Sequence, residues 1–148
     1  MLFRSLLVTF VASGEIVKTG YQDYHSTIVK PADPTGTGFT FTGWEPEVDD
    51  VVPAHDVVYT AAFNRDSYYA TFIVDDSVAK KTLLDYEAEI VKPNNPVKTG
   101  YTFKGWQPEV PDKMKAHDMT FTALFDINKY GITWETNGSY TEDRKSVV

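Results

Sequence analysis

The feature that most constrains this chain is an internal repeat with a spacing of 62 residues. Sliding the sequence against itself by that spacing places Gly43-Trp44 on Gly105-Trp106, because 106 minus 44 is 62. The alignment of residues 7–63 with residues 69–125 needs no gap and contains 26 identities in 57 pairs. Chance does not produce such agreement, so the two segments are copies of one folding unit, and this repeat rather than chain length sets the number of domains.

The repeat predicts how the chain is divided. We expect a first repeat at residues 6–65, a second at 66–127 and a truncated third, with one strand and a turn, at 128–142. The connectors at residues 64–67 and 126–128 are too short to act as flexible tethers. We therefore expect the units to stand end to end as a semi-rigid rod.

The two ends of the chain have a different interpretation. Residues 1–5 and 143–148 resemble common sequencing-library adapters translated in frame. Our hypothesis is that both segments are adapter-derived. We then expect them to have no consistent place in the fold and to contribute little to stability.

Each copy has the pattern of β-strands. Apolar residues alternate over short runs bounded by Gly, Pro, Asn and Asp, which favours strands over helices. In the second copy this pattern predicts four strands, at residues 69–74, 78–85, 101–106 and 119–125. Two prolines within residues 87–98 exclude a regular strand or a long helix, so this segment should cross from one part of the sheet to another. The predicted fold class is mostly β, α+β at most, with about four strands in each small unit.

Three local signals refine this pattern in the second copy. Asp75-Asp76 should form the turn between the first two strands. Gly105, inside the third strand, indicates a bulge or a close approach of another backbone. Pro108 should end that strand, since proline has no amide hydrogen to donate.

Composition and charge exclude several classes of function. The net charge of -7, from 14 Lys and Arg against 21 Asp and Glu, repels phosphate backbones and anionic lipid, so we expect no nucleic-acid partner. The absence of cysteine excludes disulfides and thiolate metal sites, and packing must hold the fold together. No run approaches the roughly 18 apolar residues of a transmembrane helix, so we expect no membrane insertion within this segment.

Four strings in the sequence resemble one known family of repeats. They are TGYTFKGW at 99–106, PEVP at 108–111, AHDMTFTALF at 116–125 and YGITWETNG at 130–138. The family is the internalin-type B-repeat, also called the Listeria-Bacteroides repeat. The resemblance implies a small β-grasp-like unit, secreted and displayed in tandem on bacterial surface proteins, often beside adhesive domains. It implies no catalytic residues.

The recurring positions form a structural signature of the repeat rather than an active site. They are Phe10, Gly43, Trp44, His55, Asp56 and Phe63 in the first copy, and Phe72, Gly105, Trp106, His117, Asp118 and Phe125 in the second. The sequence contains no nucleophile motif, glycine-rich phosphate loop or paired acid with a suitable partner, so we predict no enzyme and no cofactor. The acidic pairs at residues 49–50 and 75–76 lack the spacing of a known calcium loop, so we predict no metal.

The histidines are candidates for metal or general-base chemistry. His55-Asp56 and His117-Asp118 occupy the same repeat position, whereas His25 has no counterpart in the second copy. A ligand set needs several converging donors, and the two copies should lie about a repeat length apart. We therefore favour a turn role, in which Asp56 and Asp118 bond local backbone amides before the fourth strand.

The two tryptophans leave two functions open. Trp44 and Trp106 recur beside a glycine and two residues before a proline, as expected of a large side chain that anchors a small core. This reading favours a stalk or spacer with a possible adhesion surface for protein on a host or neighbouring cell. The alternative is a carbohydrate-binding array that uses Trp44 and Trp106 as platforms for a glycan. Both readings place the protein outside the cell or at the bacterial surface, with the signal and the anchor in other segments.

Overall fold

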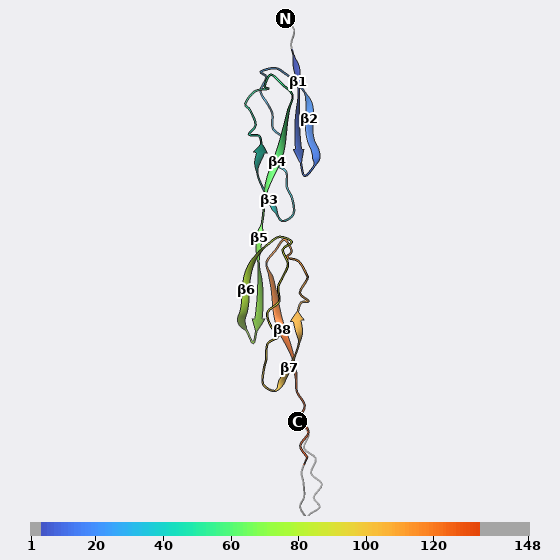
Figure 1. Cartoon of the computed structure of the whole chain (residues 1–148), viewed down its shortest axis with the longest axis vertical. Coiled ribbons are helices and arrows are strands. Elements are labelled where there is room, and N and C mark those ends of the chain that lie inside the picture. Colours follow the sequence, from blue (N-terminus) through green and yellow to red (C-terminus); the bar gives the residue numbers. More distant parts are fainter. Residues whose placement is uncertain (1–3, 134–148) are drawn as a thin grey trace, which may run out of the picture.

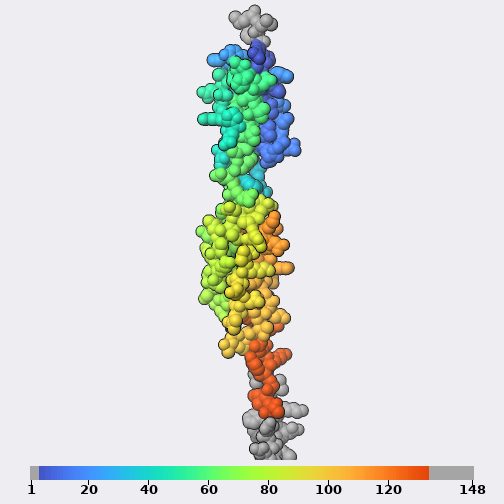
Figure 2. Space-filling model, in the orientation of Figure 1, coloured from blue at the N-terminus to red at the C-terminus, as the bar shows by residue number. Residues whose placement is uncertain are grey.

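The computed structural model describes residues 4–133, and within this range it is built of strands and loops with no helix. The strands form two four-stranded sheets in tandem, and Figure 1 shows the two sheets following each other along the long axis of the molecule. In the space-filling view, the second unit continues the first along that axis (Figure 2). The predicted class of mostly-β tandem repeats is therefore confirmed, in its variant without a helix.

The two sheets have the same topology. The strands of the first are β1 (Ser5–Ala12), β2 (Glu15–Asp23), β3 (Phe39–Glu45) and β4 (Val57–Arg65), and those of the second are β5 (Ser67–Val74), β6 (Ser77–Asp85), β7 (Tyr101–Gln107) and β8 (Met119–Ile127). The orders are β2-β1-β4-β3 and β6-β5-β8-β7. The central pair of each sheet is parallel, and both outer pairs are antiparallel. The four strands predicted for the second copy match β5 to β8 to within two residues at each end.

The local signals in the second repeat have the expected structure. Asp75 and Asp76 connect β5 to β6 with φ values of 47° and 61°, the pair of positive values that a tight two-residue hairpin turn requires. At Gly105 the register of β7 on β8 shifts, and the φ of 139° belongs to a region that only glycine adopts readily. The predicted turn and bulge are both confirmed, and β7 ends before Pro108 as expected.

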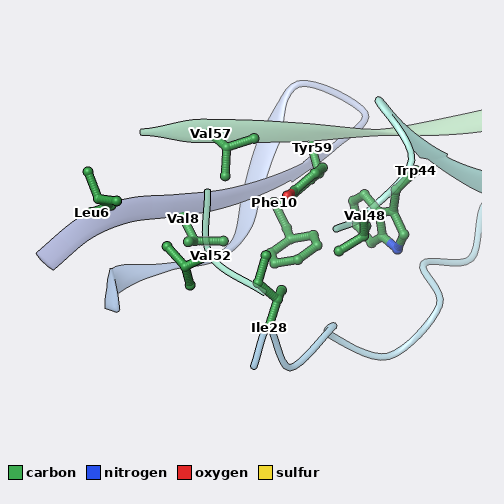
Figure 3. Packing of buried hydrophobic residues seen from close by; sticks show 9 residues of the cluster. All are labelled: Leu6, Val8, Phe10, Ile28, Trp44, Val48, Val52, Val57 and Tyr59. Carbon is green, nitrogen blue, oxygen red and sulfur yellow. The ribbon is translucent and has the colours of Figure 1, made fainter. Parts of the chain in front are cut away.

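Loops rather than a helix cover the inner face of each sheet. Parallel strands need a long crossover, and the loops before and after the third strand of each repeat place buried side chains against the sheet. Figure 3 shows the resulting first core, which contains Leu6, Val8, Phe10, Trp44, Val57 and Tyr59 from the strands and Ile28, Val48 and Val52 from the loops. A lysine on the second strand of each repeat bonds to the loop that follows that strand. Lys18 Nζ donates to the carbonyl of Val29 at 2.5 Å, and Lys80 Nζ donates to that of Val91 at 2.8 Å.

The second core uses the same positions as the first, and two of the exchanges between them are coupled. Its buried members are Ala70, Phe72, Ile90, Val110, Met114 and Phe121. In the first repeat the fully buried Tyr59 donates its hydroxyl hydrogen to Asp49 Oδ2 at 2.8 Å. At the same positions the second repeat has Phe121 and Pro111, so the hydroxyl and its acceptor are absent together. This pairing follows the rule that a buried polar group needs a partner.

The start of the first repeat differs from the sequence expectation. Ser5 begins β1, and Ser5 Oγ donates to Asp23 Oδ1 at 3.1 Å, as Ser67 Oγ does to Asp85 Oδ1 at 2.7 Å. Position 5 therefore has a defined place in the fold, because the β1–β2 ladder extends to it. Position 4 also has a partner in the fold, because the backbone N–H of Tyr24 donates to the carbonyl of Arg4 at 2.9 Å. Residues 1–3 and 134–148, which hold the rest of the proposed adapter segments and most of the expected third repeat, lie outside the described residues.

Alkaline pH should weaken the first repeat through Tyr59. Burial, and next the hydrogen bond to the Asp49 carboxylate, raises the pKa of Tyr59 from 10.0 to about 12. The unfolded tyrosine loses its proton near pH 10. The contribution of Tyr59 to the free energy of unfolding is therefore fully present below pH 10 and is lost as the pH rises to about 12.

Urea unfolding across this alkaline range, followed through the methyl signals of each repeat because carbon-bound hydrogens do not exchange with water, measures the effect. We expect Tyr59→Phe to reduce the loss of stability in the first repeat, whereas Tyr21→Phe, at an exposed position, leaves it unchanged. The second repeat has Phe121 at the equivalent position, so any alkaline loss of stability there comes from other groups, such as Tyr68, whose pKa is also raised by desolvation. An unaltered pH dependence in Tyr59→Phe would show that the Tyr59–Asp49 pair does not carry the effect.

Candidate functional site

Trp44 lies inside the first core. Its side chain is 8% exposed, and its ring packs edge-on against Phe10, with centroids 5.0 Å apart, and against Phe41 at 5.4 Å. Figure 3 shows the indole beside Phe10, Val48 and the other core side chains. With so little exposed surface, Trp44 cannot present a broad ring face to a sugar, and the structure places it as a packing residue.

Trp106 makes the same contacts but is less deeply buried. Its ring centroid lies 4.9 Å from that of Phe72 and 5.4 Å from that of Phe103, in edge-on arrangements like those of Trp44. The half-buried side chain also lines a cavity of about 330 Å³. The other lining residues are Lys92, Asn95, Phe103, Lys104, Gly105, Glu109 and Val110. The aromatic ring and the amide and charged groups around it thus line an open hollow on the surface of the second repeat.

The signature aspartates accept hydrogen bonds from distant backbone amides and not from the local amides that were predicted. Asp56 Oδ1 accepts a hydrogen bond from the backbone N–H of Leu7 at 2.8 Å, and Asp118 Oδ1 accepts one from that of Tyr69 at 2.8 Å. The prediction of local amides is wrong, because each amide lies 49 residues earlier, at the start of the repeat. Since the first and fourth strands are parallel neighbours, the residue before the fourth strand lies beside the start of the first.

The histidines do not form a site. His55 Nδ1 lies 2.8 Å from the carbonyl oxygen of Asp56, within its own turn, and His117 is exposed at the equivalent position. His25 has a φ of 64°, and its backbone amide donates to the carbonyl of Val52. Within residues 4–133 no three His, Cys, Asp or Glu side chains come close enough to hold a metal ion. No helix in the same range is long and apolar enough to cross a membrane.

The remaining signature residues are structural in position. Phe10 and Phe72 are buried at the centre of the two cores. Phe63 and Phe125 are partly buried at the far ends of β4 and β8, and Phe125 packs against Phe103 with ring centroids 5.8 Å apart. Gly43 forms in β3 the same bulge that Gly105 forms in β7.

The residues that join one repeat to the next, which we call the joint, were not predicted from the sequence. In this structure the joint consists of Gly38, Phe39 and Thr40 from the first repeat and Asp66 and Tyr86 from the second. The ring of Tyr86 lies over Gly38 and edge-on to Phe39, with ring centroids 5.8 Å apart. A signal for it was present, because three of these positions, those of Gly38, Thr40 and Tyr86, are identical in the two aligned copies.

Removing the Asp118 carboxylate should loosen the second sheet where β5 and β8 begin. We expect Asp118→Ala to lower the free energy of unfolding by about 1 kcal/mol, because it leaves the Tyr69 amide without its acceptor at a partly hydrated position. Asp118→Asn keeps an oxygen acceptor and should lose less. Asp112→Ala is a control. Asp112 bonds the backbone N–H of Ile90 through its backbone carbonyl, which alanine also has, so the change removes a carboxylate without removing this hydrogen bond. Equal losses in Asp118→Ala and Asp112→Ala, measured by urea unfolding, would contradict this role.

Comparison with known proteins agrees with this architecture. The family model of the Listeria-Bacteroides repeat domain matches residues 7–56 and 68–123. Internalin H of Listeria monocytogenes is 33% identical over 119 residues, which cover 68% of this chain and 22% of that protein. A protein of Evansella cellulosilytica named "Putative Gly-rich membrane protein" is 27% identical over 134 residues, which cover 78% of this chain and 15% of that protein.

The chain therefore spans less than a quarter of the length of these two relatives. The two matched segments fall on the two four-stranded sheets, one segment on each. Together the matched segments cover most of the 148 residues, so the chain belongs to the Listeria-Bacteroides repeat domain family, of the internalin type.

Proposed function

We propose that this chain is a non-enzymatic spacer in a bacterial cell-surface or secreted protein, where it holds a terminal binding domain away from the cell. The observation that carries the proposal is the serial arrangement of the two repeats along one axis (Figure 1). Only Asp66 separates β4 from β5, so one sheet follows directly on the other. A spacer needs this combination of length and short connections, and it needs no reactive site.

The relatives support the same reading. The chain matches about a fifth of Internalin H and 15% of the Evansella protein named as a membrane protein, as a module within a longer polypeptide would. Surface display of this chain and any contact with protein on a host or neighbouring cell belong to the proposal. The net charge of -7 favours display in water over adsorption to anionic lipid.

A reach measurement tests the spacer. A reporter domain that binds an immobilised target is displayed on cells through one, two or three repeats, and binding is measured through a polymer layer of graded thickness. We expect the reach to increase in proportion to the number of repeats. The reach of a Gly/Ser linker with the same number of residues should increase only with about the square root of that number. A square-root dependence for the repeats would contradict a rod-like spacer.

The cavity beside Trp106 supports a second candidate, a carbohydrate-binding function confined to the second repeat. Sugar rings pack against aromatic side chains, and Lys92, Asn95 and Glu109 supply polar groups at the cavity. Two edge-on phenylalanine contacts to Trp106 favour the packing role instead. The spacer therefore remains the preferred function.

Replacement of Trp106 by alanine distinguishes the two. If the indole is mainly a packing residue, Trp106→Ala should lower the free energy of unfolding by up to about 3–5 kcal/mol, the range for a fully buried large aromatic side chain. Trp44→Ala, at the more buried equivalent, should lose at least as much. Thermal melting measures both, and a glycan array with the wild-type chain completes the test. Glycan binding by the wild type that a stably folded Trp106→Ala variant lacks would favour the carbohydrate-binding function.

A further inference from the structure

The joint holds the two repeats through one aspartate that bonds to both. The Asp66 backbone N–H donates to the carbonyl of Gly38 at 2.9 Å, and Thr40 Oγ1 donates to Asp66 Oδ1 at 2.6 Å. On the other side, the backbone N–H of Tyr86 donates to the Asp66 carbonyl at 2.8 Å. The start of β3 in the first repeat and the end of the β5–β6 hairpin in the second are thus connected through a single residue.

A close ring contact adds to these hydrogen bonds. A methyl group on Gly38 would overlap the ring of Tyr86, and the φ of +74° at Gly38 is strained for any residue with a side chain. Both the backbone conformation and the space beneath the ring therefore require glycine. Because the ring rests directly on the backbone, a rotation of one repeat about the connector would break the contact.

The far end of the second repeat has the same half-joint. The Asn128 backbone N–H donates to the carbonyl of Gly100 at 2.8 Å, and Thr102 Oγ1 donates to Asn128 Oδ1 at 2.5 Å. Gly100 has a φ of +81°, close to that of Gly38, but a methyl group placed there meets nothing within 4 Å in the described part of the chain. Within residues 4–133, the surface that Tyr86 covers at Gly38 is therefore uncovered at Gly100.

The complementary half-joint lies at the start of the first repeat. Tyr24 occupies the position of Tyr86, since 24 plus 62 is 86, and its backbone N–H donates to the carbonyl of Arg4 at 2.9 Å, as that of Tyr86 does to Asp66. Its side chain is 54% exposed, and its ring neighbour is His25, with ring centroids 5.7 Å apart. Tyr24 is therefore placed as Tyr86 is, without a glycine beneath it.

We propose that Gly100 and Tyr24 are open halves of the joint and that each docks a further repeat of this family in the same polypeptide. The occupant of Gly100 is an aromatic ring at the position of Tyr86, and the occupant of Tyr24 is a glycine at the position of Gly38. The joint between Gly38 and Tyr86 is the observation that identifies these partners, because the same chain shows both halves assembled. This inference concerns how repeats connect, and it stands whether or not the array acts as a spacer.

A matched pair of alanine substitutions tests the assembled joint in the present chain. Gly38→Ala and Gly100→Ala introduce similar backbone strain, but only the first places a methyl group against a tyrosine ring. Residual dipolar couplings report whether the two repeats share one alignment. We expect one shared alignment in the wild type and in Gly100→Ala, and two separate alignments in Gly38→Ala.

Tyr86→Ala is the second variant, since it removes the ring without straining Gly38 and should also separate the alignments. Amide spectra check that each repeat stays folded in all variants. A shared alignment in both Gly38→Ala and Tyr86→Ala would show that the ring contact does not set the orientation and would overturn the proposal.

An extended chain tests the open half at Gly100. In a fusion of residues 1–127 with a second copy of residues 66–127, the added tyrosine equivalent to Tyr86 should cover Gly100. In the present chain Gly100→Ala should not change the orientation of the repeats. In the fusion, the same change in the original second repeat should separate the alignments of the second and third repeats. If the second and third repeats still share one alignment in this variant while the added repeat is folded, Gly100 is not a docking surface for a repeat.

The Tyr24 half has an equivalent test. In a fusion of residues 1–65 with residues 4–133, Arg4→Asp in the second segment restores the aspartate of the joint. We expect the accessibility of the second-segment Tyr24, measured by photo-CIDNP, to fall to the level of Tyr86. An unchanged signal from that tyrosine in the folded fusion would overturn the assignment, and would leave Tyr24 to a partner of another kind.

Discussion

The parallel pairing of the first and fourth strands is the constraint on which each repeat depends. Parallel neighbours cannot be joined by a hairpin, so a long segment has to cross the sheet between them. In this chain the crossing segment contains no helix in the described residues, and its apolar side chains, such as Ile28 and Val52, pack against the inner face of the sheet and complete the core. The aspartate before the fourth strand, Asp56, then bonds the Leu7 amide where the parallel ladder begins. Core, crossover and signature aspartate therefore all follow from one strand pairing.

The two copies show how such a core diverges without losing its polar balance. Tyr59 buries a hydroxyl and bonds it to Asp49, while the second copy has Phe121 and Pro111 at these positions. A tyrosine at 121 facing a proline would leave a buried hydroxyl without an acceptor, which costs about 1–3 kcal/mol. The two positions are therefore coupled, because a buried tyrosine without an acceptor at the other position meets a penalty that the paired exchange avoids.

Much of the fold follows from the sequence because its determinants are local. Alternation located the strands, and Gly105 located the bulge, since period-two patterns and glycine both act within a few residues. The partner of Asp118 could not be predicted in the same way, because it depends on which strands are neighbours in the sheet. The difference in exposure between Trp44 and Trp106 was also beyond the sequence, since the two indoles have nearly identical neighbours in the alignment.

The joint explains why a short connector is enough to keep successive repeats in line. A single connecting residue limits the distance between two units but leaves their relative rotation free, so a rod also needs a contact away from the chain axis. The ring of Tyr86 on Gly38 is such a contact, and the bonds of Asp66 to both repeats hold it in register. Glycine is required there for its φ of +74° and for the space beneath the ring, so a side chain at this position would act on orientation before it acted on either core. Stiffness of the array is in this way determined separately from the stability of its units.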